Sequence, residues 1–169
     1  MSDTNLIFDI SGFPPESARN CVQELSPIPN GEFRKSLNGD LMFLATSERR
    51  RYRSVITCRD INTPIIDKLW IGSQLHIGCI QNLWQSFKPG ETKITLIRPA
   101  VAGSINAVNN FGEPIPFKLI DNELHLYAPN DSEVFVCFRP WLTMRVISFK
   151  MTTDEWNISG GWTLELEEI

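Results

Sequence analysis

Side chains able to carry out acid–base or nucleophilic catalysis are few in this sequence. Histidine is the usual base near neutral pH, and the chain has two, His76 and His125, each within a run typical of a β-strand. Neither belongs to a Ser-His-Asp or Cys-His motif, and the sequence has no P-loop, HExxH motif, GxSxG elbow or EF-hand loop. We therefore expect both histidines to be structural and the protein not to be an enzyme.

The carboxylates and thiols lead to the same expectation. Asp154 and Glu155 lie in a polar stretch, where a solvated loop is a better interpretation than an acid–base or metal pair. The four cysteines lie more than twenty residues apart, which fits neither a CxxC metal clip nor a dense disulfide framework. They are Cys21, Cys58, Cys79 and Cys137. We expect free thiols, no metal and no cofactor.

The hydrophobic pattern that must position these residues is that of β-strands. Almost every apolar segment alternates with period two or is a short β-branched run, and no window sustains a helical stripe. Asn38-Gly39-Asp40 predicts a tight hairpin between Phe33–Leu37 and Leu41–Leu44, because Asn-Gly supplies the positive φ that such a turn needs. Further strands are expected at Arg53–Cys58, Gln74–Leu83, Val134–Phe138, Leu142–Phe149 and Gly161–Glu168. The predicted fold is mainly β, an antiparallel β-sandwich or barrel-like domain.

Prolines and turn residues divide the chain into segments. Residues 1–30 contain four prolines and predict an extended Pro-rich N-terminal arm, with a short helix over Pro15–Leu25 as the alternative. Residues 94–130 predict a small β-meander insertion of four short strands separated by turn residues. The main β domain would then comprise residues 31–93 and 131–169.

A basic run is the most conspicuous charge feature. It consists of Arg49, Arg50, Arg51 and Arg53, and the C-terminal acids Glu165, Glu167 and Glu168 are its natural partners. Arginines beside an aromatic residue fit phosphate contacts, but 20 acidic against 16 basic residues give a net charge of −4, which argues against nucleic acid. We predict that the arginines and these acids pair across a subunit interface. A plain solvated face is the alternative.

Two tryptophans add to the predicted interface. Trp141 directly follows Arg139-Pro140, and Trp156 lies between Glu155 and Asn157, at expected strand edges or turns. An amphipathic ring in such a place often marks a contact surface.

The overall composition limits the class of protein. With 42% hydrophobic and 21% charged residues in a chain of 169, it is typical of one soluble globular domain and not of a disordered or membrane protein. The first residues lack the basic and apolar regions of a signal peptide, so we expect a protein made and kept in a cytoplasm.

Several stretches of the chain carry a family resemblance. They are Ile10–Leu25, Arg34–Leu41, Arg51–Cys58, Phe138–Val146 and Asp154–Glu168. Their sequences resemble small virion proteins encoded among the tail genes of siphophages, and the resemblance spans nearly the whole chain apart from Ile94–Ala128. Its motifs are structural and not catalytic. The resemblance implies a symmetric virion assembly at the tail or baseplate.

The expected function is therefore that of a virion structural protein of a tailed phage. We expect it to form a homo-oligomeric ring in the tail tube, distal tail or baseplate, and to contact other tail or baseplate proteins. Its location would be the virion tail, after synthesis in the host cytoplasm, with no membrane segment and no nucleic acid partner. The alternative is a β module that binds a host-surface glycan or protein, or decorates the capsid.

Overall fold

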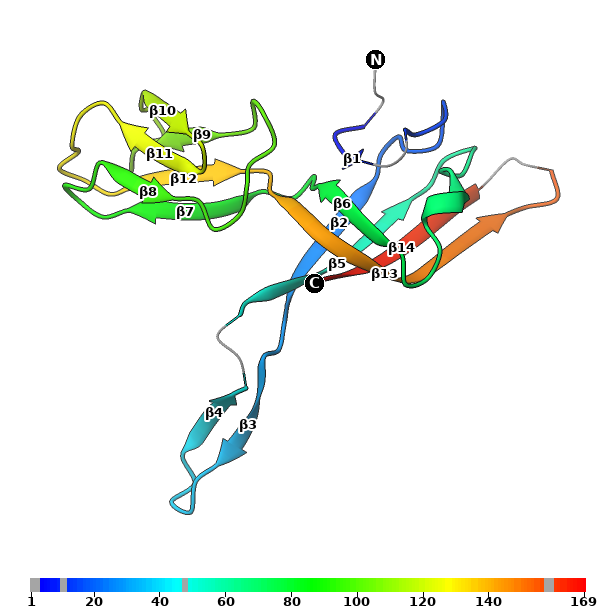
Figure 1. The fold of residues 1–169 in the computed structure, drawn as a ribbon, viewed down its shortest axis with the longest axis horizontal. Helices are drawn as coiled ribbons and strands as arrows, with labels where there is room; N and C mark the ends of the chain where they lie inside the picture. The colour runs from blue at the N-terminus through cyan, green and yellow to red at the C-terminus, as the bar shows by residue number, and fades with distance from the viewer. Residues whose placement is uncertain (1–3, 10–11, 47–48, 157–159) are drawn as a thin grey trace. The chain divides into compact units, whose positions relative to one another are not determined.

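The computed structural model describes residues 4–9, 12–46, 49–156 and 160–169. Their regular secondary structure is nearly all β-strand, arranged in several antiparallel sheets of a β-sandwich-like class (Figure 1). One short 3₁₀ turn, Ile66–Lys68, interrupts the strands. No helix among the described residues is long and apolar enough to cross a membrane. The predicted mainly β fold is confirmed.

The contacts group the chain into two compact units. Unit 1 comprises Met1–Gly12 and His76–Leu142, and unit 2 comprises Phe13–Leu75 and Thr143–Ile169.

Unit 2 is built on an antiparallel sheet in the order β13-β14-β5-β2. The bounds of these strands are Trp141–Thr153, Gly160–Glu168, Arg51–Cys58 and Val22–Ile28. The last strand alternates as the sequence predicts: Trp162, Leu164 and Leu166 are buried, while Glu165 and Glu167 lie on the more exposed face. Register places Leu164 opposite Ile56 and Glu167 opposite Arg53. One face of the sheet is therefore the core of unit 2, and the other carries charge.

Unit 1 contains two three-stranded sheets, β7-β12-β9 and β10-β11-β8. In the first sheet, β7 is Leu83–Phe87, β12 is Val134–Phe138 and β9 is Asn106–Val108. In the second sheet, β10 is Phe117–Ile120, β11 is Glu123–Leu126 and β8 is Lys93–Thr95. A shared core joins them, with Phe87, Val136 and Phe138 from one sheet and Leu124 from the other. A short pair, β1 (Ile7–Phe8) with β6 (Gln74–Gly78), completes the unit through residues 7–8 and 77–78.

The unit boundaries differ from the predicted ones. β12 pairs on one side with β7 and on the other with β9, so the meander shares its core with strands expected in the main domain. The contacts therefore group residues 76–142 together, a wider span than the predicted insertion of 94–130. The single strand expected over Gln74–Leu83 is divided into β6 and β7.

Parts of the predicted N-terminal arm of residues 1–30 form strands of the sheets. Within them β1 pairs with β6, and β2 pairs along its length with β5. Glu16 and Asn20 have positive φ, which breaks the alternative helix over Pro15–Leu25 into turns. Residues 1–3 and 10–11 of the predicted arm lie outside the described residues.

The Asn38-Gly39 hairpin forms as predicted. β3 (Gly31–Lys35) and β4 (Leu41–Ala45) pair antiparallel beyond the end of the β2–β5 ladder (Figure 1). Gly39 has φ +86°, and its N–H donates to the Ser36 carbonyl. At the other end, a Cβ on Gly31 would clash with the Leu44 carbonyl and lie 2.7 Å from Ala45 Cα. Glycine is thus required where the two strands approach most closely.

Candidate assembly surface

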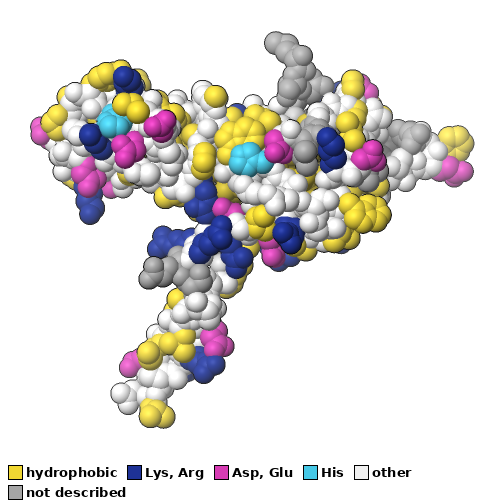
Figure 2. Space-filling view, viewed as in Figure 1, with side chains coloured by type: hydrophobic (Ala, Val, Ile, Leu, Met, Phe, Trp, Pro, Cys, Tyr) yellow, Lys and Arg dark blue, Asp and Glu magenta, His cyan; other side chains and the backbone are white. Residues whose placement is uncertain are grey.

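The β3–β4 hairpin exposes large apolar side chains that nothing in the described chain covers. Their relative exposures are Phe33 69%, Leu37 108%, Leu41 66%, Met42 49%, Phe43 44% and Leu44 44%. In Figure 2 hydrophobic side chains are visible along the hairpin at the bottom of the view. A contiguous apolar surface of this kind marks an interaction site in a soluble protein.

Both faces of the hairpin carry exposed apolar side chains. Pairing of Phe33 with Phe43 puts these rings and Leu41 on one face, and the ring centroids lie 4.9 Å apart. Met42 and Leu44 lie on the other face, with the Glu32–Arg34 ion pair. A two-stranded hairpin exposed on both sides is at best marginally stable in water. The hairpin therefore needs a partner beyond the described part of its own chain.

Sequence reasoning missed these residues as site candidates. A readable signal was present, because Leu41–Ala45 has no polar residue at either alternate position. Such a strand cannot present a solvated face. The adjacent Asn38-Gly39 turn indicated a hairpin, but the sequence alone did not show that no other element would cover the hairpin.

The predicted arginine run lies where the hairpin joins the sheet. Dark blue side chains gather there in Figure 2, and the three residues 49–51 are all exposed. Arg49 donates to the backbone carbonyl of Ile169 at 2.6 Å. A groove of about 480 Å³ lies at the same place, with Arg50, Arg51 and Phe43 in its lining.

The C-terminal acids contact this region within one chain. Arg53 Nη2 lies 3.3 Å from Glu165 Oε2, and Arg53 Nε lies 3.9 Å from Glu167 Oε1. The buried carboxylate of Glu168 accepts a 2.9 Å hydrogen bond from the Tyr52 backbone N–H. The structure thus brings the predicted charge partners together, because β5 and β14 are neighbouring strands. That they also pair between subunits stays a prediction.

The two predicted interface tryptophans differ in environment. Trp141 is half-buried and stacks on His76 in unit 1, with ring centroids 4.9 Å apart and planes 1° apart. Trp156 is 79% exposed, as a contact ring would be. Trp70 and Trp84 are also largely exposed, at 72% and 60%, and were not singled out from the sequence.

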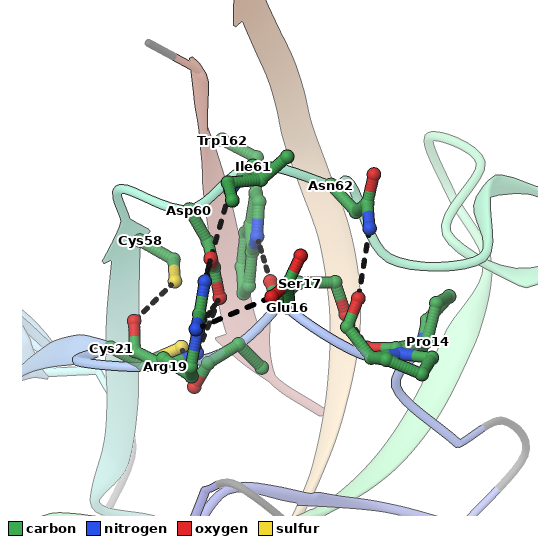
Figure 3. Close-up of polar contacts among 12 residues, drawn as sticks. Pro14, Glu16, Ser17, Arg19, Cys21, Cys58, Asp60, Ile61, Asn62 and Trp162 are labelled. Carbon is green, nitrogen blue, oxygen red and sulfur yellow. Dashed lines mark hydrogen bonds and ion pairs between the residues drawn. The ribbon is translucent and has the colours of Figure 1, made fainter. Parts of the chain in front are cut away.

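A buried polar cluster joins the turn at 14–20 to Asp60. Asp60, 8% exposed, accepts hydrogen bonds from the Arg19 backbone N–H at 2.9 Å, from Arg19 Nη2 at 2.8 Å and from the Ile61 backbone N–H at 2.8 Å (Figure 3). Burial alone would raise the pKa of Asp60, but these hydrogen bonds outweigh it and the pKa is lowered. Trp162 Nε1 donates to the Ser17 carbonyl beside it at 2.7 Å.

The surroundings of His125 and of the cysteines singled out from the sequence are as follows. His125 Nε2 lies 3.4 Å from Oε2 of Glu123, which precedes it by two residues in β11. None of the four cysteines, all of them within the described ranges, is in a disulfide, and the pKa of Cys58 is raised by its burial and by the adjacent Cys21. Among the described residues, no group of three or more His, Cys, Asp or Glu is placed to hold a metal ion.

No protein-family model matches the chain, and no curated protein is significantly similar to it.

Proposed function

We propose that this protein is a structural subunit of a tailed-phage virion, which assembles with copies of itself into a ring in the tail or baseplate. The observation that supports the proposal best is the β3–β4 hairpin, whose two faces are apolar and exposed. The virion itself is proposed from the resemblance of the sequence to small siphophage tail proteins.

The apolar side chains of the hairpin provide most of the surface that an assembly contact needs. At roughly 150–200 Å² for a fully exposed side chain of this size, its six large apolar residues present roughly 600 Å². One partner of a standard protein interface contributes about 800 Å². Because each copy in a ring repeats the same contact, modest individual contacts give a stable assembly.

The remaining surfaces of the subunit are proposed to support this role. Arg50 and Arg51 line the groove at the hairpin base and are suited to an acidic neighbour. Trp156 presents a largely exposed ring, which fits a contact with a further tail or baseplate protein.

Light scattering after size exclusion, with negative-stain images of the same fraction, tests the assembly role. We expect the wild-type protein to form a closed oligomer and the double variant Phe33→Ser/Phe43→Ser to remain a monomer with an unchanged far-UV spectrum. Phe111→Ser is the matched control, because Phe111 is 86% exposed but lies in a turn of unit 1. An oligomer that survives the double variant would refute the hairpin's role.

Detection of the chain in purified tail particles by mass spectrometry tests the virion assignment separately. A protein that is absent from such particles, stays monomeric and binds a host-surface glycan would support the alternative of a binding module.

A further inference from the structure

We propose that β3 of one copy pairs antiparallel with β3 of a second copy about Phe33, which joins two hairpins into a four-stranded sheet. This inference rests on the proposed assembly role and names the partner of the hairpin. The contact is two-fold and joins copies in pairs, so the proposed ring would form from such pairs through a second contact. Three observations carry it: the direction of the backbone groups at the free edge, the signs of the charges along it, and the aromatic residue at its centre.

The backbone of β3 has hydrogen-bonding groups available on its outer edge. The Ser36 N–H donates inward to the Asp40 carbonyl, and the Asn30 carbonyl accepts inward from the Thr46 N–H. Because these groups alternate in direction along a strand, the even-numbered residues of β3 face β4. The N–H and C=O groups of Gly31, Phe33 and Lys35 therefore face away from it.

Antiparallel pairing about Phe33 uses all of these outward groups. Phe33 would exchange two hydrogen bonds with Phe33 of the second copy, and Gly31 would exchange two with Lys35 of the second copy at each end. Pro29, two residues before Gly31, has no N–H to offer and ends the ladder. The proposed contact is thus limited to Gly31–Lys35.

Charge selects this register over its neighbours. In it Glu32 of each copy lies opposite Arg34 of the other, in a pair where side chains are close. A slip of two residues in one direction would place Glu32 opposite Glu32, and a slip in the other direction would place Arg34 opposite Arg34. Both side chains are exposed, at 59% and 66%, and already form an ion pair with each other within the strand, which the pairing would extend to the second copy. Charged residues usually protect a strand edge from pairing, but here their signs are self-complementary.

The aromatic residues favour the same arrangement. Phe33 and Phe43 already form a cross-strand pair within the hairpin. Pairing at β3 would extend this pair into a row of four rings across the new sheet, and aromatic cross-strand pairs are among the more stabilising ones. The free edge of β4 is entirely apolar over Leu41–Ala45 and contains no charge that would fix a register.

Disulfide trapping tests the pairing directly. Residues exchanging hydrogen bonds across antiparallel strands have Cα atoms about 5.5 Å apart, which is within the range for a disulfide. We expect Phe33→Cys to give a covalent homodimer under mild oxidation. Leu37→Cys is the matched control, because Leu37 is fully exposed in the same hairpin but lies far from its own copy in this register. The wild-type protein gives the background from its native thiols.

Charge exchange tests the register. We expect Arg34→Glu and Glu32→Arg each to weaken dimerisation about tenfold, because two favourable contacts become repulsive. The double variant Glu32→Arg/Arg34→Glu should restore the wild-type affinity in sedimentation equilibrium. The hairpin lies outside both cores, so the far-UV spectra should not change.

The outcomes separate this inference from the proposed function. Trapping of Phe33→Cys together with rescue by the double variant supports the pairing. An oligomeric wild type in which Phe33→Cys is trapped no better than Leu37→Cys, or in which the double variant is not rescued, overturns the pairing and leaves the assembly role standing. A wild type that is monomeric at every concentration overturns both.

Discussion

At the scale of single residues, the Arg19–Asp60 pair is the clearest determinant of local structure. Asp60 is buried, and its carboxylate accepts hydrogen bonds from both the backbone N–H and the side chain of Arg19, 41 residues earlier in the chain. Two residues of the turn at 14–20, Glu16 and Asn20, have positive φ. A charge-assisted hydrogen bond is worth more than a neutral one, so this carboxylate holds the turn against the sheet of unit 2.

Replacing Asp60 with asparagine should therefore destabilise the protein in a pH-dependent way. We expect Asp60→Asn to lower the free energy of unfolding by about 1–3 kcal/mol at pH 7, because the charge that the Arg19 hydrogen bonds favour is removed. Since the pKa of Asp60 is lowered on folding, its contribution is present above the unfolded value of about 3.9 and is lost as pH falls below it.

Urea unfolding of the two proteins between pH 7 and pH 3 measures this effect. The difference between them should shrink as the pH falls through 4. Glu16→Gln is the control, because its 3.6 Å contact with Arg19 is exposed and such pairs contribute little. A difference that stays constant with pH would refute an ionic role for Asp60.

The Cys58 thiol should be unreactive in the folded protein. Its burial and the neighbouring Cys21 raise its pKa, so the nucleophilic thiolate is scarce at pH 8. We expect iodoacetamide labelling followed by peptide mass spectrometry to find Cys58 modified only after unfolding, with the half-buried Cys137 modified earlier. Equal labelling of the two thiols in the native protein would contradict this expectation.

At the scale of elements, the sequence predicted strands better than their associations. Alternation identified the buried face of β14 at Trp162, Leu164 and Leu166, and Asn38-Gly39 identified the hairpin, because both signals are local. The pairing of β12 with both β7 and β9 was not predictable, since it joins residues far apart in the chain. The exposure of Phe33 and Phe43 was missed for the same reason: only the folded chain shows which elements leave them uncovered.

The hairpin should be the least protected element in the monomer. With both faces exposed and only two strands, its opening costs little, whereas β14 lies between β13 and β5 in a buried sheet. We expect hydrogen exchange measured by mass spectrometry to show rapid exchange over Gly31–Ala45 at low protein concentration and slow exchange over Gly160–Glu168. Raising the concentration until copies associate should slow exchange in the hairpin and leave β14 unchanged.

At the scale of the whole molecule, each unit carries its own hydrophobic core. In unit 1 Leu124 lies in the cluster shared by the two small sheets, and in unit 2 Leu164 lies on the buried face of the sheet that contains β14 and β5. Both side chains are 0% exposed. The chain passes from one unit to the other three times. The core cluster of unit 1 comes from the continuous segment His76–Leu142, whereas unit 2 combines segments on either side of it.

Matched truncations of the two leucines should distinguish the cores. We expect Leu124→Ala and Leu164→Ala each to lower the free energy of unfolding by about 2–5 kcal/mol, because each leaves a cavity in a closed core. Hydrogen exchange should show increased opening mainly at 76–142 for the first variant and mainly at 51–58 and 160–168 for the second. An equal loss of protection in both units from either variant would show that the chain opens as one cooperative body. The hairpin amides, which exchange rapidly in any case, should be unaffected by both changes, because the hairpin contributes to neither core.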